Sequence, residues 1–423
     1  MNDPQASPPF VDAADSGYAV LRNRDFLRFL IGRFSASFGQ QMFVLAIGWE
    51  IYERTHSAFN LGLVGLTQIV PIFLLTLPAG HLADNYNRKQ IIMWMAIVIA
   101  VTNLGLATIS GLGAPVPWIY LCLFVTAAAR TFMWAATASF LPQLVERKNI
   151  SRAINWTSGS FQLSAILGPL AAGTVIALAT PHMTHPAGPV YVLNALAGLT
   201  CFSLMASVRL HHKVAERQKM TLRNLLTGFD FVLSNRIILG VISLDMFAVM
   251  LGGATALLPV YAKDILHIGP RGLSYLTMAL PMGAVLCAFI LAHRPPLQKA
   301  GHSLLWAVTA FGVATVVFGF SKWFWVSFAA LFIAGAVDNI SVMVRHTLVQ
   351  TLTPDEKRGR VSAVNNLFIG TSNEMGEFES GAVAAWLGPV FSVVSGGVGT
   401  ILVVIAVALI WPEIRKYGRL DTG

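Results

Sequence analysis

The stretch LPAGHLADNYNRKQIIMW, Leu77–Trp94, places a short polar loop between two apolar runs. The runs cover residues 60–83 and 89–112, and each has the roughly 20 residues that a helix needs to cross a bilayer. The loop ends in the basic pair Arg88 and Lys89. Long apolar runs joined by short basic loops predict an all-α polytopic membrane protein.

The same pattern extends along all 423 residues, of which 55% are hydrophobic and 12% are charged. A soluble domain carries about 25% charged residues, so a large soluble core is excluded. We expect twelve transmembrane helices, of which the first and the eleventh are the most polar. They cover residues 26–50, 60–83, 89–112, 117–141, 153–179, 188–209, 237–262, 270–292, 303–321, 324–346, 363–386 and 388–411.

The basic residues indicate the orientation of these helices. Most of the 29 Lys and Arg residues fall in loops that share one side of the membrane with both termini. Cytoplasmic loops are enriched in Lys and Arg, so we expect both termini in the cytoplasm and the protein in the plasma membrane. This placement also explains the net charge of +9 without nucleic-acid binding. The exceptions on the outer side are Arg54, Lys263, Arg271 and Lys322.

Five segments follow from this pattern. Residues 1–25 are a disordered cytoplasmic tail, 26–209 a six-helix bundle, 237–411 a second six-helix bundle, and 412–423 a cytoplasmic tail. Residues 210–236 predict either a basic amphipathic helix on the inner membrane surface or a plain linker. The short repeat of RAIN (152–155) and SAVN (362–365) after basic loops favours two pseudo-symmetric halves. A transporter built in this way binds its substrate between the halves.

The loop GHLADNYNRKQ, Gly80–Gln90, resembles the signature of the major facilitator superfamily. Asn85 and Asn87 depart from the signature, although Asn tolerates the left-handed turn that glycine commonly makes there. The resemblance implies a cytoplasmic gate in which Asp84 accepts hydrogen bonds from the start of the eleventh helix. The alternative is positive-inside anchoring together with a helix stop. The matching residues include Gly80, Leu82, Ala83, Asp84, Arg88 and Lys89.

A second motif, SAILGPLAAG at Ser164–Gly173, resembles the Gly-Pro motif that marks antiporters of this superfamily. Gly168, Pro169 and Gly173 match it, and small residues replace two other glycines. Proline kinks a helix and small residues allow close packing. The resemblance implies export, although Gly-Pro pairs are common in membrane helices.

The segment RGRVSAVNNLFIGTSNEMGEFESG, Arg358–Gly381, resembles the eleventh helix of the subfamily that contains the enterobactin exporter and macrolide-efflux proteins. The resemblance implies proton-driven extrusion of a bulky, amphipathic molecule, either a siderophore or a drug-like compound. It leaves the substrate open.

Acidic residues in the eleventh span point to the same chemistry. At 100° per residue, Glu374 and Glu377 share a helix face, and Glu374 lies near the bilayer midplane. A charged carboxylate in lipid costs several kcal/mol, and burial beside a like charge favours the protonated form. We therefore expect proton coupling through Glu374 and Glu377, with Arg130 and Asp245. Arg130 also resembles the fourth-helix arginine of many superfamily members.

The remaining polar and aromatic residues of the spans give weaker signals. Pairing of Arg33 with Asp245 fits a structural or a functional role equally well, whereas Glu379, Asp338 and Arg345 favour structural charge pairs. A further set of side chains is a candidate lining for a central cavity, although aromatic residues in spans mostly face lipid or neighbouring helices. These are Phe132, Trp134, Phe161, Phe247, Asn366, Phe368 and Asn373.

Several function classes are excluded by missing patterns. The ten His residues show no metal-binding spacing, the three cysteines form no pair, and no phosphate-binding loop is present. We therefore expect no enzyme, no cofactor and no metal. The expected partners are a small-molecule substrate, protons and the lipid bilayer, and the expected state is a monomer. The alternatives to an exporter are a proton-coupled importer of a small organic solute and a non-transporting membrane scaffold or sensor.

Overall fold

A computed structural model describes residues 18–209, 229–295, 299–416 and 418, and this part of the chain contains helices and no strand. The predicted all-α fold is confirmed. The tail predicted at 1–25 and the linker predicted at 210–236 lie mostly outside the described residues. The helices of the first half are α1 (Arg24–Thr55), α2 (Ala58–Asn85), α3 (Arg88–Gly111), α4 (Val116–Leu144), α5 (Ile150–Ala179) and α6 (Gly188–Ser207).

The second half follows the same plan after a helical stretch at 229–234. Its long helices are α8 (Arg236–Leu251), α10 (Gly269–Ala292), α11 (Ala300–Phe320), α12 (Phe324–Leu352), α13 (Asp355–Leu387) and α14 (Pro389–Ile410). Shorter helical elements are η1 (Ala19–Arg22), η2 (Arg147–Asn149), η3 (Ala254–Leu257), α9 (Leu258–Val260), η4 (Tyr261–Ile265) and α15 (Pro412–Lys416), the last of which begins the predicted C-terminal tail.

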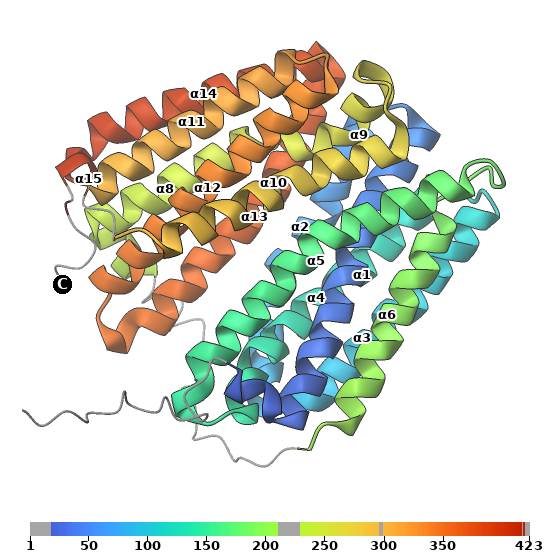
Figure 1. Ribbon diagram of the computed structural model, residues 1–423, viewed down its shortest axis with the longest axis horizontal. Coiled ribbons are helices and arrows are strands. Elements are labelled where there is room, and N and C mark those ends of the chain that lie inside the picture. The colour runs from blue at the N-terminus through green and yellow to red at the C-terminus, as the bar shows by residue number, and fades with distance from the viewer. Residues whose placement is uncertain (1–17, 210–228, 296–298, 417, 419–423) are drawn as a thin grey trace, which may run out of the picture.

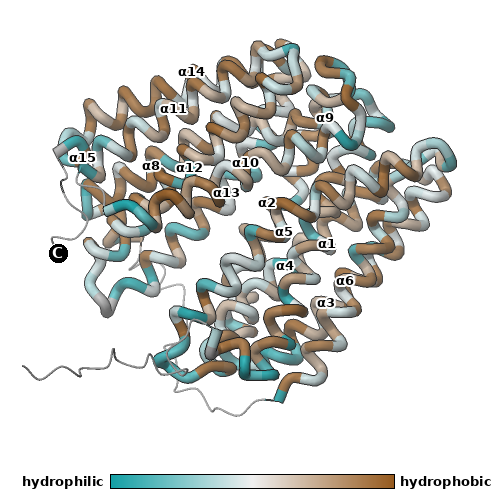
Figure 2. The backbone as a smooth tube through the Cα atoms, viewed as in Figure 1, coloured by the Kyte–Doolittle hydropathy of each residue, from teal (hydrophilic) through white to brown (hydrophobic). Residues whose placement is uncertain are grey.

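Ten helices of the described chain are long and apolar enough to cross a membrane. Hydrophobic residues run along most of the helices in Figure 2, and hydrophilic residues gather at helix ends. The two other long helices, α1 with 32 residues and α13 with 33, are the spans expected to be most polar. The helix α1 packs against α5 and α6, and α13 packs against α2, α8 and α14. Twelve spans therefore stay a prediction for α1 and α13, whose place depends on packing more than on their own apolarity.

Side-chain caps explain several of the helix boundaries. Asn23 accepts hydrogen bonds from two backbone amides at the start of α1, and Asn235 does the same for α8. Asn87 caps α3 by accepting a hydrogen bond of 3.0 Å from the Lys89 amide. Its φ of −64° is not left-handed, so the turn expected at this position is wrong. Asn fits here because its side chain satisfies a free helix-end amide.

The seventh span is broken instead of continuous. It runs as α8 to Leu251, breaks at Gly252 and Gly253, and continues through η3, α9 and the π-helical turn η4. A Cβ atom at Gly253 would lie 2.5 Å from the Gly376 carbonyl oxygen of α13. The break therefore lets the backbones of α8 and α13 approach each other closely.

The two halves form separate bundles that meet at one end (Figure 1). The bundles diverge toward the end where α1 begins and α15 lies, which we call the open end. At the opposite, closed end, α2 crosses α13 and α5 crosses α10. A Cβ atom at Gly62 of α2 would lie 2.9 Å from the Phe378 carbonyl oxygen and 3.1 Å from the Gly381 Cα. Small residues at such crossings allow membrane helices to pack backbone to backbone.

Polar contacts join the bundles at the closed end as well. The Tyr52 hydroxyl of α1 donates a hydrogen bond to the Asp264 carboxylate of η4. The Lys263 ammonium lies 5.9 Å from the ring centre of Trp49, within cation–π range. These contacts tie α1 to the π-helical turn, beside the glycine crossings.

The glycine crossing predicts the effect of a bulkier residue. Gly62→Leu should separate α2 from α13 and lengthen the distance across the closed end, because the new side chain has no space. Pulsed electron spin resonance can measure this between labels at Trp118→Cys and Trp323→Cys, after replacement of the natural cysteines. Gly105→Ala is the control, because no atom lies within 4 Å of that Cβ position. An unchanged distance distribution in Gly62→Leu would contradict the packing argument.

Candidate functional site

Arg130 lies near the middle of α4 and faces α2. Its Nη1 atom donates a hydrogen bond of 3.1 Å to Oε1 of Gln68. Gln68 is 6% exposed and is held by the packing of α2 against α4. The guanidinium therefore has a fixed place inside the first bundle, at the side where α2 meets the second bundle.

Two carboxylates of the second bundle face the same place. A Cβ atom at Gly65 of α2 would lie 2.7 Å from the Glu374 carbonyl oxygen and 2.8 Å from the Glu377 Cβ. It would also lie 3.3 Å from a carboxylate oxygen of Glu377. The missing side chain at Gly65 thus makes room for the acidic face of α13 against α2. Glu379 does not share this face, and its carboxylate accepts only a long contact of 3.5 Å from Ser380.

The charges at this junction do not balance. Arg130 is within electrostatic range of both Glu374 and Glu377. One carboxylate oxygen of Glu374 is buried and has no hydrogen-bond partner among the described residues. Two acids share one guanidinium, so the formal excess is one negative charge inside the membrane. A bound proton or a cationic ligand group would neutralise it. We call these three residues the bundle-junction cluster.

Asp245, expected to act with this cluster, lies elsewhere. Its carboxylate forms an ion pair of 2.5 Å with Arg345, within the second bundle. The pairing considered between Asp245 and Arg33 is therefore not observed. The Nε atom of Arg33 is buried without a hydrogen-bond partner, and no acidic side chain of the described chain lies within ion-pair distance. Asp338 lies beside the Asp245–Arg345 pair and within electrostatic range of both.

The residues of the predicted cytoplasmic gate lie at the open end. Arg88 donates a hydrogen bond of 2.9 Å to the Ala83 carbonyl at the end of α2. Lys89 donates to the Ala206 and Val208 carbonyls at the end of α6, both at 2.8 Å. Gly80 and Asp84 lie in the last turns of α2. In this conformation both basic side chains cap helices of their own bundle, and the gating role stays a prediction.

The three residues of the Gly-Pro motif are buried in α5 and have different neighbours. Gly168 packs against α1, where a Cβ atom would lie 2.5 Å from the Gln41 Cβ. Gly173 packs against the other bundle, where a Cβ atom would lie 2.5 Å from the Pro270 carbonyl oxygen of α10. Pro169 lies between them. The motif therefore serves both internal packing of the first bundle and contact between bundles at the closed end.

The candidate lining residues do not form one group. Trp134 lies one turn beyond Arg130 on α4 and is 63% exposed. Phe161 and Phe247 are also exposed, and Phe132 is half-buried. Asn366 and Asn373 are exposed on α13. Phe368 instead packs against the Phe229 ring, with 5.7 Å between ring centres, and so contributes to an apolar cluster around α8.

Sequence reasoning missed a buried charge cluster at the closed end of the first bundle. Glu50 is 1% exposed, forms an ion pair of 2.6 Å with Arg54, and accepts a hydrogen bond of 2.6 Å from the Tyr191 hydroxyl. Arg54 also donates to the Ala114 carbonyl at 2.8 Å. The i, i+4 spacing of Glu50 and Arg54 was a signal that could have found the pair. Gln68 was missed too, although a single amide in an apolar span is such a signal.

Comparisons with known proteins fit this architecture. The chain is 24% identical to the enterobactin exporter EntS of Shigella boydii and 26% identical to that of Citrobacter koseri, over 93% of each chain. A bacterial homologue of the human lysosomal transporter Spinster, solved in an inward-facing and occupied conformation, superposes with a TM-score of 0.70 at 14% identity. That superposition covers 94% of this chain and 96% of the other.

A transporter of the POT family in complex with 5-aminolevulinic acid gives a TM-score of 0.72 at 10% identity, covering 93% of this chain and 97% of that one. The nucleoside transporter NupG gives a TM-score of 0.70 at 12% identity, covering 92% and 99%. These likenesses show the fold. The sequence model described as Major Facilitator Superfamily matches residues 29–377. The chain is thus a multi-pass membrane transporter, not an enzyme, and it belongs to the major facilitator superfamily.

Proposed function

We propose that this transporter is a secondary active exporter that exchanges protons for a bulky, amphipathic organic molecule of siderophore or drug-like character. The observation that carries the proposal is the bundle-junction cluster. Arg130 stands on one bundle, Glu374 and Glu377 stand on the other, and the cluster has one negative charge too many. A proton that neutralises the excess negative charge is bound at the contact between the two bundles, which move relative to each other during transport. Its binding and release can therefore be coupled to their movement.

Alternating access gives the cluster a role in both halves of the cycle. With both termini in the cytoplasm of a bacterial cell, the open end of this conformation faces the cytoplasm. Proton release from Glu374 or Glu377 leaves an excess of negative charge, which an incoming ligand or a new proton compensates. Separation of α2 from α13 at the closed end would move the acids away from Arg130 and Gln68. The affinity for protons would then differ between the two conformations, as coupling requires.

The direction of transport is supported by two features. The relatives at 24–26% identity are named as exporters, and the helix-5 residues Gly168, Pro169 and Gly173 resemble the antiporter motif. Import of a small organic solute is the second candidate, because a POT family transporter with 5-aminolevulinic acid and a nucleoside transporter have the same fold. The excess charge at the bundle junction argues against a non-transporting scaffold, which has no need of it.

The sign of proton movement separates antiport from symport. We expect substrate added outside proteoliposomes to enter in exchange for internal protons, so that a trapped pH dye reports a rise of internal pH. Proton symport lowers the internal pH under the same conditions. A panel of siderophores and amphipathic drugs should be added to proteoliposomes that contain the monomeric protein. The internal and external pH should be equal at the start. Substrate uptake with no pH change in either direction would contradict proton coupling.

Removal of a junction carboxylate should weaken coupling. We expect Glu374→Gln and Glu377→Gln each to reduce substrate-driven proton movement by about tenfold or more, which corresponds to about 1.4 kcal/mol. Transport should also depend less steeply on pH, because one proton-binding carboxylate of the junction is gone. Glu379→Gln is the matched control and should retain coupled transport. Full transport with normal pH dependence in both junction variants would show that these acids are structural.

Charge balance predicts a rescue. Arg130→Gln leaves two carboxylates without their guanidinium, so folded protein and proton movement should both fall. Adding Glu377→Gln to Arg130→Gln removes one of those carboxylates and should restore folding, although not coupling. Thermal unfolding of the purified protein measures the first effect and the trapped dye measures the second. Equal stability of the single and double variants would mean that Arg130 does not interact with Glu377.

A further inference from the structure

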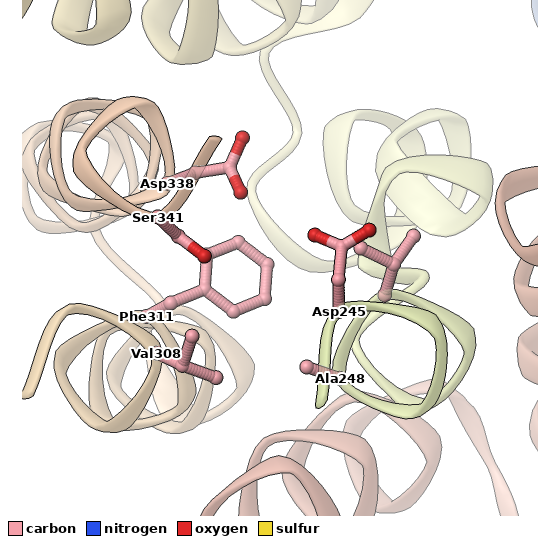
Figure 3. Close-up of a pocket in the computed structure, with 7 residues that line it drawn as sticks. Asp245, Ala248, Val308, Phe311, Asp338 and Ser341 are labelled. Carbon is pink, nitrogen blue, oxygen red and sulfur yellow. The ribbon is translucent and has the colours of Figure 1, made fainter. Parts of the chain in front are cut away.

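We propose a second proton-binding site, formed by Asp338 in a pocket inside the second bundle and separate from the bundle-junction cluster. The pocket lies between α8, α11 and α12 (Figure 3). Its space is about that of one water molecule. Asp245 and Ala248 of α8, Val308 and Phe311 of α11, and Asp338 and Ser341 of α12 line it.

Three polar side chains line this pocket. In Figure 3 the carboxylates of Asp338 and Asp245 and the hydroxyl of Ser341 lie around the Phe311 ring. Ser341 is 3% exposed and contributes to the wall of the pocket. Buried hydroxyl groups are normally hydrogen-bonded. A hydroxyl and two carboxylates in the wall of one small pocket indicate that the pocket takes up something small and polar.

Charge balance identifies what is bound. Asp245 is paired with Arg345, and their side chains are 7% and 4% exposed. Asp338 lies within electrostatic range of both, but no ion pair to it is formed in the described part of the chain. Two carboxylates again share one guanidinium near the middle of membrane helices. An unmatched carboxylate there costs several kcal/mol in its charged form. Asp245 keeps its charge through Arg345, so the proton resides on Asp338.

A metal ion fits this pocket poorly. Hard cations take six or more oxygen ligands, whereas the pocket offers the oxygens of two carboxylates and one hydroxyl. Val308, Phe311 and Ala248 form the remaining walls, and Arg345 repels a second cation. A proton needs only one oxygen. On Asp338 it can be donated to the Asp245 carboxylate or to a water molecule in the pocket, with Ser341 as a further partner.

In the membrane part of the described helices around the pocket, no other charged group can neutralise the unmatched carboxylate in place of this proton. The membrane part of α11 has no titratable side chain, and α8 has only Asp245 between its ends. On α12 the next titratable residue is His346, adjacent to Arg345. Of the helices behind the pocket, α10 contributes only Tyr275 and Cys287 beyond its first turn, which holds Arg271, and α14 contributes none. Within the expected span 363–386, the acids of α13 are Glu379 and the junction pair, and the pair is turned toward Gly65 of α2.

The pocket is nevertheless connected to the junction through α8. Asp245 lies two helical turns before the break at Gly252, and the pocket wall includes Val249. A Cβ atom at Gly376 of α13 would lie 2.9 Å from the Val249 carbonyl oxygen. Gly376 stands directly between the two junction acids in the sequence. Loss of the proton from Asp338 would therefore act on the segment of α8 that packs against the acidic part of α13. The proton on Asp338 and the proton of the bundle-junction cluster would then be linked in one transport cycle.

Infrared spectroscopy tests this site without a substrate. A protonated carboxylic acid has its own carbonyl band, and difference spectra between neutral and alkaline pH report its loss. We expect the wild-type protein in lipid nanodiscs to show a component that is lost in Asp338→Asn. The same component should persist in the double variant Glu374→Gln with Glu377→Gln, which removes the junction acids. Asp230→Asn, at an exposed position, is the matched control and should leave the spectrum unchanged.

The outcomes separate this site from the proposed export function. An Asp338→Asn spectrum identical to wild type would overturn the proposal, whatever the transport assays show. A component that disappears at constant pH when Na⁺ replaces choline would also overturn it, because the pocket would then bind a metal ion. Ser341→Ala provides a second test if Asp338→Asn folds poorly. Loss of the neighbouring hydroxyl should shift the frequency of the band while keeping its amplitude, and an unmoved band would place the proton elsewhere.

Discussion

The crossing of α2 and α13 without side chains between them is the constraint on which the rest of the structure depends. Gly62 and Gly65 on α2 meet Gly381 and the backbone at Glu374 on α13. Because the backbones touch there, the acidic face of α13 is pressed against the bundle that holds Arg130. A larger residue at either glycine would separate the acids from the guanidinium. The packing of the closed end and the electrostatics of the junction are thus consequences of one contact.

Three buried charge clusters differ in whether their charges balance. Glu50 pairs with Arg54 and accepts a hydrogen bond from Tyr191, so the charges of this cluster balance. The bundle-junction cluster and the pocket around Asp338 each combine two carboxylates with one guanidinium. A balanced pair needs no ligand and fixes the ends of helices. An unbalanced set inside a membrane requires a proton or a ligand, which is what a carrier can exchange.

The sequence predicted the helices well and the contacts between helices poorly. Apolar runs bounded by charged loops determine where helices lie, so the expected range 270–292 became α10 at Gly269–Ala292. The shared face of Glu374 and Glu377 followed from helical geometry alone. Pairing of Arg33 with Asp245 could not be judged in this way, because it depends on how separate helices are rotated and packed. The close approach of α13 to Gly253 likewise depends on how separate helices pack, which no local pattern reveals.

The two ends of the molecule are held by different kinds of interaction. The closed end combines glycine crossings with a few polar contacts between bundles, such as Tyr52 with Asp264. At the open end Arg88 and Lys89 donate to carbonyls of their own bundle, at the ends of α2 and α6. In the proposed cycle, Arg88 and Lys89 would exchange these carbonyls for new partners when that end closes. In the proposed mechanism, the charge state of the junction acids biases which of the two ends is closed.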